Sequence, residues 1–268
     1  MKRWQNFLLV IIVVVFISVY TSRDSLALLV WQEYHLPQMA VLLDGNNAEL
    51  AMSMGGYYFN SVNGGGEYNV EVAEKAYEKA VSINPGILWG HYQLARIHFV
   101  KGDFAGALEE INKELEANPE NLRSLYIRGL IYGYRNEVGD LEKAEADFRR
   151  FTEWAPSEWA GYNDLAWVLL KEGKYADTEI ELKRAFENIS EGNMNPWLWN
   201  ARGVAELNLR KYSRATNSFK RAKELAEKLT LEDWRRSYPG NNPATSGEGF
   251  SAFRRAIDEN LRRAESKR

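Results

Sequence analysis

Four prolines recur at near-regular intervals, and this spacing constrains the fold more than any other feature of the 268-residue chain. The residue before a proline avoids the helical region, so each X-Pro step predicts the end of a helix. A period in this range predicts an array of repeated units rather than one globular core. Successive prolines lie 34, 37 and 40 residues apart, in the steps Asn84-Pro85, Asn118-Pro119, Ala155-Pro156 and Asn195-Pro196.

Between the prolines the same pattern of residues returns. The segment "LARIHFVKGDFAGALEEI" at 94–111 aligns with segments 165–182 and 202–219 and, after a three-residue insertion, with 128–148. Each unit predicts two helices joined by a turn, with a small residue in the first helix where the second must approach closely. These small residues are Ala95, Gly129, Ala166 and Gly203. The second helix carries a small residue and then a bulky one on the same face: Ala107 and Ile111, Ala144 and Phe148, Thr178 and Leu182, Ala215 and Phe219.

This order of small, turn, aromatic, small, bulky and proline resembles the tetratricopeptide repeat family. Four units follow one another from residue 88 to about 229, and a fifth fits at 54–85 with an insertion at 60–69. Two further departures from the pattern are Thr178 in place of alanine and Glu114 in place of a small residue. The resemblance implies an all-α solenoid of about five helix-turn-helix repeats, which binds partners rather than performing chemistry.

The N-terminus carries an uncharged apolar run from Phe7 to Tyr20, preceded by Lys2 and Arg3. Counted from Trp4, a helix of this run extends about 26 Å, close to the thickness of a hydrocarbon core. We therefore expect a signal anchor or transmembrane helix over residues 4–20, within a first segment 1–24; a cleaved signal peptide is the alternative. The basic residues predict a cytoplasmic N-terminus and a single-pass membrane protein with an extracytoplasmic repeat domain.

The remaining segments are assigned from their patterns. We expect a juxtamembrane or capping helix at 25–47, the repeat array at 48–229, and a loop with a capping helix at 230–268. Thr230 and Asp233 predict a capping box, which marks the start of a helix. The last helix, about 250–267, places one apolar stripe on its surface, formed by Phe250, Phe253, Ile257 and Leu261.

Composition and motifs argue against several classes of function. The chain has no cysteine, and its net charge of -3 is too small to recruit nucleic acid. His91 and His98 share one helical stripe, and without a third ligand at helical spacing we expect them to pack between helices rather than bind a metal. No phosphate-binding loop and no connected nucleophile, base and acid are evident, so we predict neither an enzyme nor a cofactor.

Function is expected on the concave side of the solenoid, which the first helices line. Rings and amides there suit a protein or peptide partner, although exposed tryptophans also suit a glycan or polysaccharide. Whether the loop at 237–250 folds back into this groove is left open. Helical phase predicts that the following residues face the groove: Trp89, Tyr92, Arg96, Phe99, Tyr126, Tyr134, Asn163, Trp167, Trp197 and Asn200.

Overall fold

The computed structural model describes residues 22–60, 67–190, 192–238 and 241–267. These residues form two compact units, which we call the N-terminal unit, up to Gly90, and the C-terminal unit, from His91 onward. Within these ranges all regular secondary structure is helical, and no strand is present. The predicted all-α class is confirmed.

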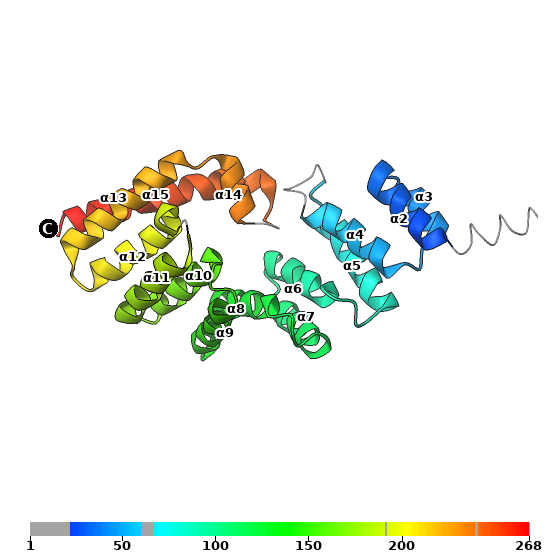
Figure 1. Cartoon of the computed structure of the whole chain (residues 1–268), viewed down its shortest axis with the longest axis horizontal. Coiled ribbons are helices and arrows are strands. Elements are labelled where there is room, and N and C mark those ends of the chain that lie inside the picture. The colour runs from blue at the N-terminus through cyan, green and yellow to red at the C-terminus, as the bar shows by residue number, and fades with distance from the viewer. Residues whose placement is uncertain (1–21, 61–66, 191, 239–240, 268) are drawn as a thin grey trace, which may run out of the picture. The chain divides into compact units, whose positions relative to one another are not determined.

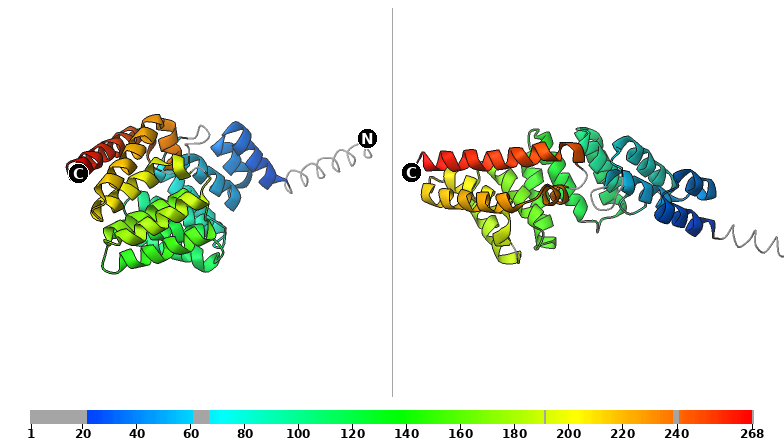
Figure 2. Two further views of the ribbon diagram at one scale, coloured as in Figure 1. Left: turned by 60° about the vertical axis from the view of Figure 1, so that its left-hand side comes forward. Right: turned by 90° about the horizontal axis from the view of Figure 1, so that it is seen from above.

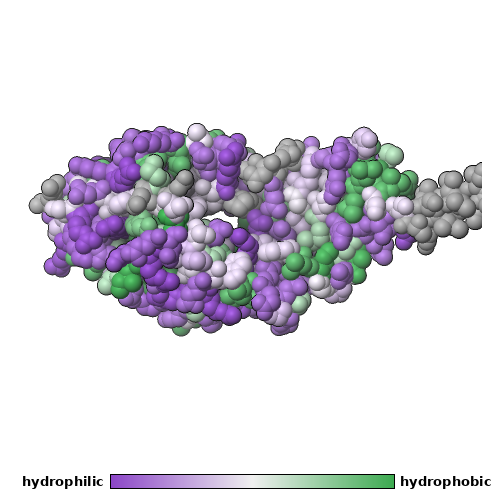
Figure 3. Space-filling view, viewed as in Figure 1, coloured by the Kyte–Doolittle hydropathy of each residue, from purple (hydrophilic) through white to green (hydrophobic). Residues whose placement is uncertain are grey.

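Four helices are described in the N-terminal unit, from residue 22 onward. They are α2 (Arg23–Tyr34), α3 (Pro37–Asp44), α4 (Ala48–Phe59) and α5 (Val70–Ile83). Trp31 of α2 is buried against α4, where its indole Nε1 donates to the Ser53 hydroxyl at 3.0 Å. Other apolar side chains of α2 and α3 face outward, and they give the apolar area over these two helices in Figure 3. Leu42 is the most exposed of them, at 87%.

The C-terminal unit continues the helix pairs. Its first helices are α6 (Gly90–Val100), α8 (Arg123–Arg135), α10 (Trp159–Lys171) and α12 (Pro196–Asn208). The second helices are α7 (Phe104–Ala117), α9 (Asp140–Trp154), α11 (Tyr175–Asn188) and α13 (Tyr212–Lys228). The chain then forms α14 (Leu231–Ser237) and α15 (Ser246–Glu265), with short 3-10 turns at Gly192–Met194 and Pro243–Thr245.

Small residues lie where each helix pair packs most closely, as the pattern predicts. A methyl group built on Gly129 would lie 2.9 Å from the Phe148 ring, and one on Gly203 would lie 2.5 Å from the Phe219 ring. Both phenylalanines are fully buried. Glycine is therefore required at these two positions because a phenylalanine of the paired helix occupies the space of a side chain.

The structure also shows the roles of Glu114 and of the predicted capping box. Glu114, which replaces a small residue, is fully buried and accepts hydrogen bonds from the Tyr92 backbone N–H at 3.1 Å and from two asparagine amides. Its carboxylate thus joins α7 to the start of α6 and to the turn that follows α7. The Thr230–Asp233 capping box is present at the start of α14, as predicted.

Helix α15 packs along α13 (Figure 2). Ile257 and Ala264 are buried in this contact, and Phe253 packs beside Ile257. The Arg254 guanidinium donates to the carbonyls of Ala226 and Leu229, at 2.9 and 3.0 Å. It thereby satisfies carbonyl groups that the end of α13 leaves without helical partners.

The predicted membrane-spanning helix calls for a correction. Residues 4–20 lie outside the described residues, and no helix within the described ranges is both long and apolar enough to cross a membrane. Helix α2 has 12 residues, about 18 Å, whereas a hydrocarbon core is about 30 Å thick. Helix α15 has 20 residues but carries charges throughout its length. The predicted localisation as a single-pass membrane protein conflicts with this finding and is not retained.

Candidate functional site

The first helices α6, α8 and α10 lie on the inner side of the curved C-terminal unit, with α7, α9 and α11 outside them (Figure 1). Helices α8 and α10 carry four of the predicted groove residues: Tyr126, Tyr134, Asn163 and Trp167. Together with Asp164 of α10 they form what we call the inner aromatic surface. Neighbouring first helices thus bring together residues that are nearly forty positions apart in the chain.

Asp164 links the two helices of this surface. Its carboxylate accepts the Tyr126 hydroxyl at 2.7 Å and the Asn163 side-chain amide at 3.0 Å. Burial raises the pKa of Asp164 to about 6, although both hydrogen bonds act in the opposite direction. Burial also raises the pKa of Tyr126 well above its ordinary value, and the charge of Asp164 adds to this. The surface therefore holds an acid whose ionised form is poorly solvated.

Sequence reasoning did not select Asp164. A usable indication was present, because no basic residue stands three or four positions before or after it on α10. An acid on a helix face without such a partner lacks the usual intrahelical ion pair.

Aromatic contacts extend the surface along α8 and α10. The Tyr134 ring lies 5.0 Å from the Trp167 ring and 5.3 Å from that of Phe99, measured between centroids. Tyr134 remains 57% exposed despite these contacts. It therefore combines a fixed position with an accessible ring, as a binding anchor requires.

Two cations lie over rings of the first helices. The Lys171 ammonium is 4.8 Å from the Trp167 ring centroid and donates to the Gly133 carbonyl at 2.9 Å. The Arg96 guanidinium lies 5.8 Å from the Tyr92 ring centroid and donates to the Gln93 side chain at 2.8 Å. Phe99 and Tyr92 also pack against the core between α6 and α8. These residues thus already have contacts within the solenoid.

The structure places Trp197 and Asn200 elsewhere. Trp197 is only 7% exposed, with its ring stacked on those of Trp159 and Phe253 at 4.9 and 5.2 Å. Asn200 accepts a hydrogen bond from the Asn260 amide of α15 at 3.4 Å. Both residues therefore contribute to the packing of the C-terminal helices. Trp89 belongs to the N-terminal unit, where it stands in a turn with a φ of 70°.

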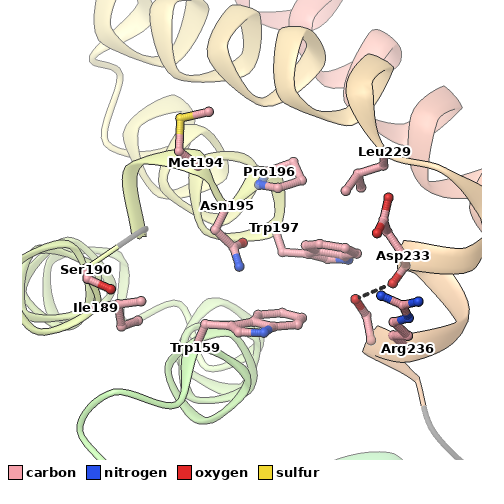
Figure 4. A pocket seen from close by; sticks show the side chains of 11 residues that line it. Trp159, Ile189, Ser190, Met194, Asn195, Pro196, Trp197, Leu229, Asp233 and Arg236 are labelled. Carbon is pink, nitrogen blue, oxygen red and sulfur yellow. Dashed lines mark hydrogen bonds between the residues drawn. The ribbon is translucent and has the colours of Figure 1, made fainter. Parts of the chain in front are cut away.

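A cleft of about 530 Å³ opens beside Trp197 (Figure 4). Trp159 and Trp197 lie in its apolar part, and Asp233 and Arg236 of α14 approach it from the other side. The Ser237 hydroxyl donates to the Asp233 carbonyl at 2.9 Å. No sequence pattern predicted this cleft, because α14 follows the repeats and its position depends on how the chain turns after α13. The full lining is Trp159, Ile189, Ser190, Met194, Asn195, Pro196, Trp197, Leu229, Asp233, Arg236 and Ser237.

The predicted stripe of histidines makes local polar contacts. His91 Nδ1 lies 2.7 Å from Glu110 Oε2, and His98 Nδ1 lies 2.8 Å from Asp103 Oδ2. Asp103 also caps α7 by accepting the Gly106 N–H. In the part of the chain that the structure describes, no three metal-ligating side chains lie together. Each histidine therefore joins the first helix of its unit to the second helix or to the turn before it.

Comparison with known proteins agrees with this architecture. A family model described as tetratricopeptide repeat matches residues 92–132. The crystal structure of a tetratricopeptide repeat protein from Parabacteroides merdae is similar, with a TM-score of 0.55 and 17% identity over 89% of this chain and 84% of that one. The family model identifies a tetratricopeptide-repeat segment within the chain, and the similar structure shows the fold. The fold prediction, a solenoid of this type, is confirmed on its helical architecture.

Two further similarities are of interest. The structure of YrrB, described as a TPR protein with an unusual peptide-binding site, has a TM-score of 0.55 and 16% identity, covering 75% of this chain and 97% of that one. Peptidyl-prolyl cis-trans isomerase FKBP4 of Bos taurus is 29% identical over 126 residues, or 47% of this chain. The matched region spans 26% of that curated relative. The structural similarity therefore shows the fold, and the curated match covers a minor part of a longer protein.

Proposed function

We propose that this chain is a scaffold that binds a protein or peptide partner on the inner aromatic surface of its C-terminal unit. The observation that carries the proposal is the combination, on adjacent first helices, of an exposed ring, Tyr134, with polar groups at Asn163 and Asp164. Rings supply contact area at a small entropic cost, and amide or carboxylate groups fix the backbone or side chains of a bound segment. The similarity to YrrB, which is described as having a peptide-binding site, is consistent with this function.

Not every predicted groove residue supports the proposal equally. Tyr134, Asn163 and Trp167 lie on the inner aromatic surface, whereas Trp197 and Asn200 pack against the C-terminal helices. Arg96 and Phe99, on α6, extend the proposed surface toward the start of the C-terminal unit. We therefore place the centre of binding between α8 and α10.

The glycan-binding alternative receives less support. A sugar stacks on an open ring face, but Trp159 and Trp197 cover one face of each other, and Trp197 also stacks on Phe253. Trp199 contacts the Phe186 ring and the Arg202 guanidinium, at 4.9 and 5.2 Å from its ring centroid. The absence of enzymatic activity remains an expectation, in keeping with a scaffold.

Crosslinking followed by affinity capture tests the proposal. We expect the full chain to capture a partner, and Tyr134→Ala with Asn163→Ala to lose most of it. Trp154→Ala provides a matched control, because Trp154 is an aromatic residue of the outer helix α9 that is 46% exposed. Circular dichroism checks that each variant is folded. If the double variant still captured the same partner and Trp154→Ala no longer did, binding would lie on the outer face instead.

A further inference from the structure

Asp164 is a half-buried carboxylate without a cationic partner. Within the described residues its hydrogen-bond donors are a tyrosine hydroxyl and an asparagine amide, both neutral, and no lysine, arginine or histidine side chain lies within ion-pair distance. Several other buried carboxylates of the same unit are paired with arginine. These pairs are Asp140 with Arg135, Asp147 with Arg128, and Glu206 with Arg202.

Tyrosine rings from two segments, α8 and the residues after α14, lie within contact or electrostatic reach of this carboxylate. Tyr126 contacts it directly, and burial together with the charge of Asp164 raises the pKa values of Tyr134 and Tyr238. Tyr238, which follows α14, therefore lies within electrostatic reach of α10. The titratable groups that face Asp164 are thus tyrosines, which are neutral near pH 7. They leave the negative charge uncompensated.

Two cations of the first helices that could act as internal counterions are already held by other groups. Lys171, two helical turns beyond Asp164 on α10, donates to the Gly133 carbonyl and lies over the Trp167 ring. Arg96 of α6 is held by Gln93 and the Tyr92 ring. A carboxylate can accept about four hydrogen bonds, and two of those positions on Asp164 are used. Its free acceptor positions and the nearby tyrosine rings match the requirements of an ammonium or guanidinium group.

We propose that Asp164 anchors a cationic side chain, lysine or arginine, of the protein partner that the inner aromatic surface binds. This inference rests on the proposed function and adds the charge of the recognised residue. The cation pairs with the carboxylate, while the tyrosine rings contact its alkyl stem and its charge. Because the carboxylate is half-buried, the pair is screened less by water and salt than an ion pair on an open surface.

Binding of defined peptide pools to the full chain tests this inference. The pools are short, acetylated and amidated peptides whose outer positions are mixtures of neutral residues, and they differ only at the centre: lysine, arginine, norleucine or glutamate. We expect the wild type to retain the lysine and arginine pools about fivefold to tenfold better than the norleucine pool. The preference should weaken as the pH falls through the pKa of Asp164, about 6, because the neutral acid cannot form the ion pair.

Two variants separate a local pair from general charge attraction. Asp164→Asn should retain the lysine and norleucine pools equally. Asp177→Asn removes the same charge from an exposed position on α11 and should keep the wild-type preference. Loss of the preference for lysine in both variants would overturn the inference and indicate diffuse charge attraction. Persistence of the preference in Asp164→Asn would overturn the inference as well.

The two proposals fail in different ways. Equal retention of the lysine and norleucine pools by the wild type overturns the cation site and leaves peptide binding by the surface intact. Failure of the wild type to retain any pool contradicts the inference and the proposed function together. Preference for the glutamate pool reverses the predicted charge of the partner and also overturns the inference.

Discussion

Asp164→Asn is expected to stabilise the folded protein at neutral pH. Asparagine keeps an oxygen that can accept the Tyr126 hydroxyl, and it removes the charge whose burial raises the Asp164 pKa. A carboxyl group whose pKa is higher in the folded chain than in the unfolded chain favours folding when protonated. The ionised form therefore reduces the stability of the wild type, and this reduction disappears at low pH.

The magnitude follows from the two pKa values of Asp164. The pKa rises from its ordinary value of 3.8 to about 6, so ionised Asp164 lowers the free energy of unfolding by at most about 3 kcal/mol at pH well above 6. Near pH 5 this loss of stability is about half as large. Because Asp164 is only half-buried, water screens part of the charge. We expect the variant to gain about 1 to 3 kcal/mol near pH 7.5.

Urea unfolding followed by far-UV circular dichroism measures the effect, at one pH near 5 and one near 7.5. Asp147→Asn is the matched control, because Asp147 is paired with an arginine. The Arg128 guanidinium donates two hydrogen bonds to the Asp147 carboxylate, each at 2.8 Å. That variant should lose stability because it leaves an arginine without its partner. A loss of stability in Asp164→Asn at the higher pH, or a gain of the same size at both, would refute the reasoning.

Three further predictions concern the site and its support. Tyr126→Phe should raise the pKa of Asp164 above about 6, because the hydrogen bond from Tyr126 lowers it; carboxyl NMR titration measures this, and an unchanged pKa contradicts the contact. Gly203→Ala should cost about 1 to 3 kcal/mol in the free energy of unfolding, because the new methyl would lie 2.5 Å from the Phe219 ring; unchanged stability would show that the ring can move. Arg254→Ala should loosen α15 from α13 and increase hydrogen exchange in α15 by removing the bonds to the carbonyls of α13; an unchanged exchange rate would mean that apolar contacts alone hold this helix.

Local packing within each repeat could be read from the sequence. Gly129 with Phe148, and Gly203 with Phe219, are close in the chain and belong to one helix pair, so periodicity alone identifies them as contacts. The turn glycines Gly102 and Gly173 follow the same logic, because their φ values of 77° and 74° favour glycine. These features repeat from unit to unit, and repetition makes them recognisable in a single sequence.

The composition of the candidate site depended on the tertiary structure. Helical phase indicates where Trp197 points relative to its own helix pair, but it cannot show that Phe253, far along the chain, stacks on the ring and buries it. Likewise, the sequence shows only that Asp164 lacks a basic neighbour on its own helix; that Tyr126, 38 residues earlier, donates to it from the neighbouring repeat is a tertiary contact. The sequence alone therefore determined the repeated helix pairs, whose contacts are local. The charge and accessibility of the inner surface were decided by contacts between repeats and with the last helices, which no local period encodes.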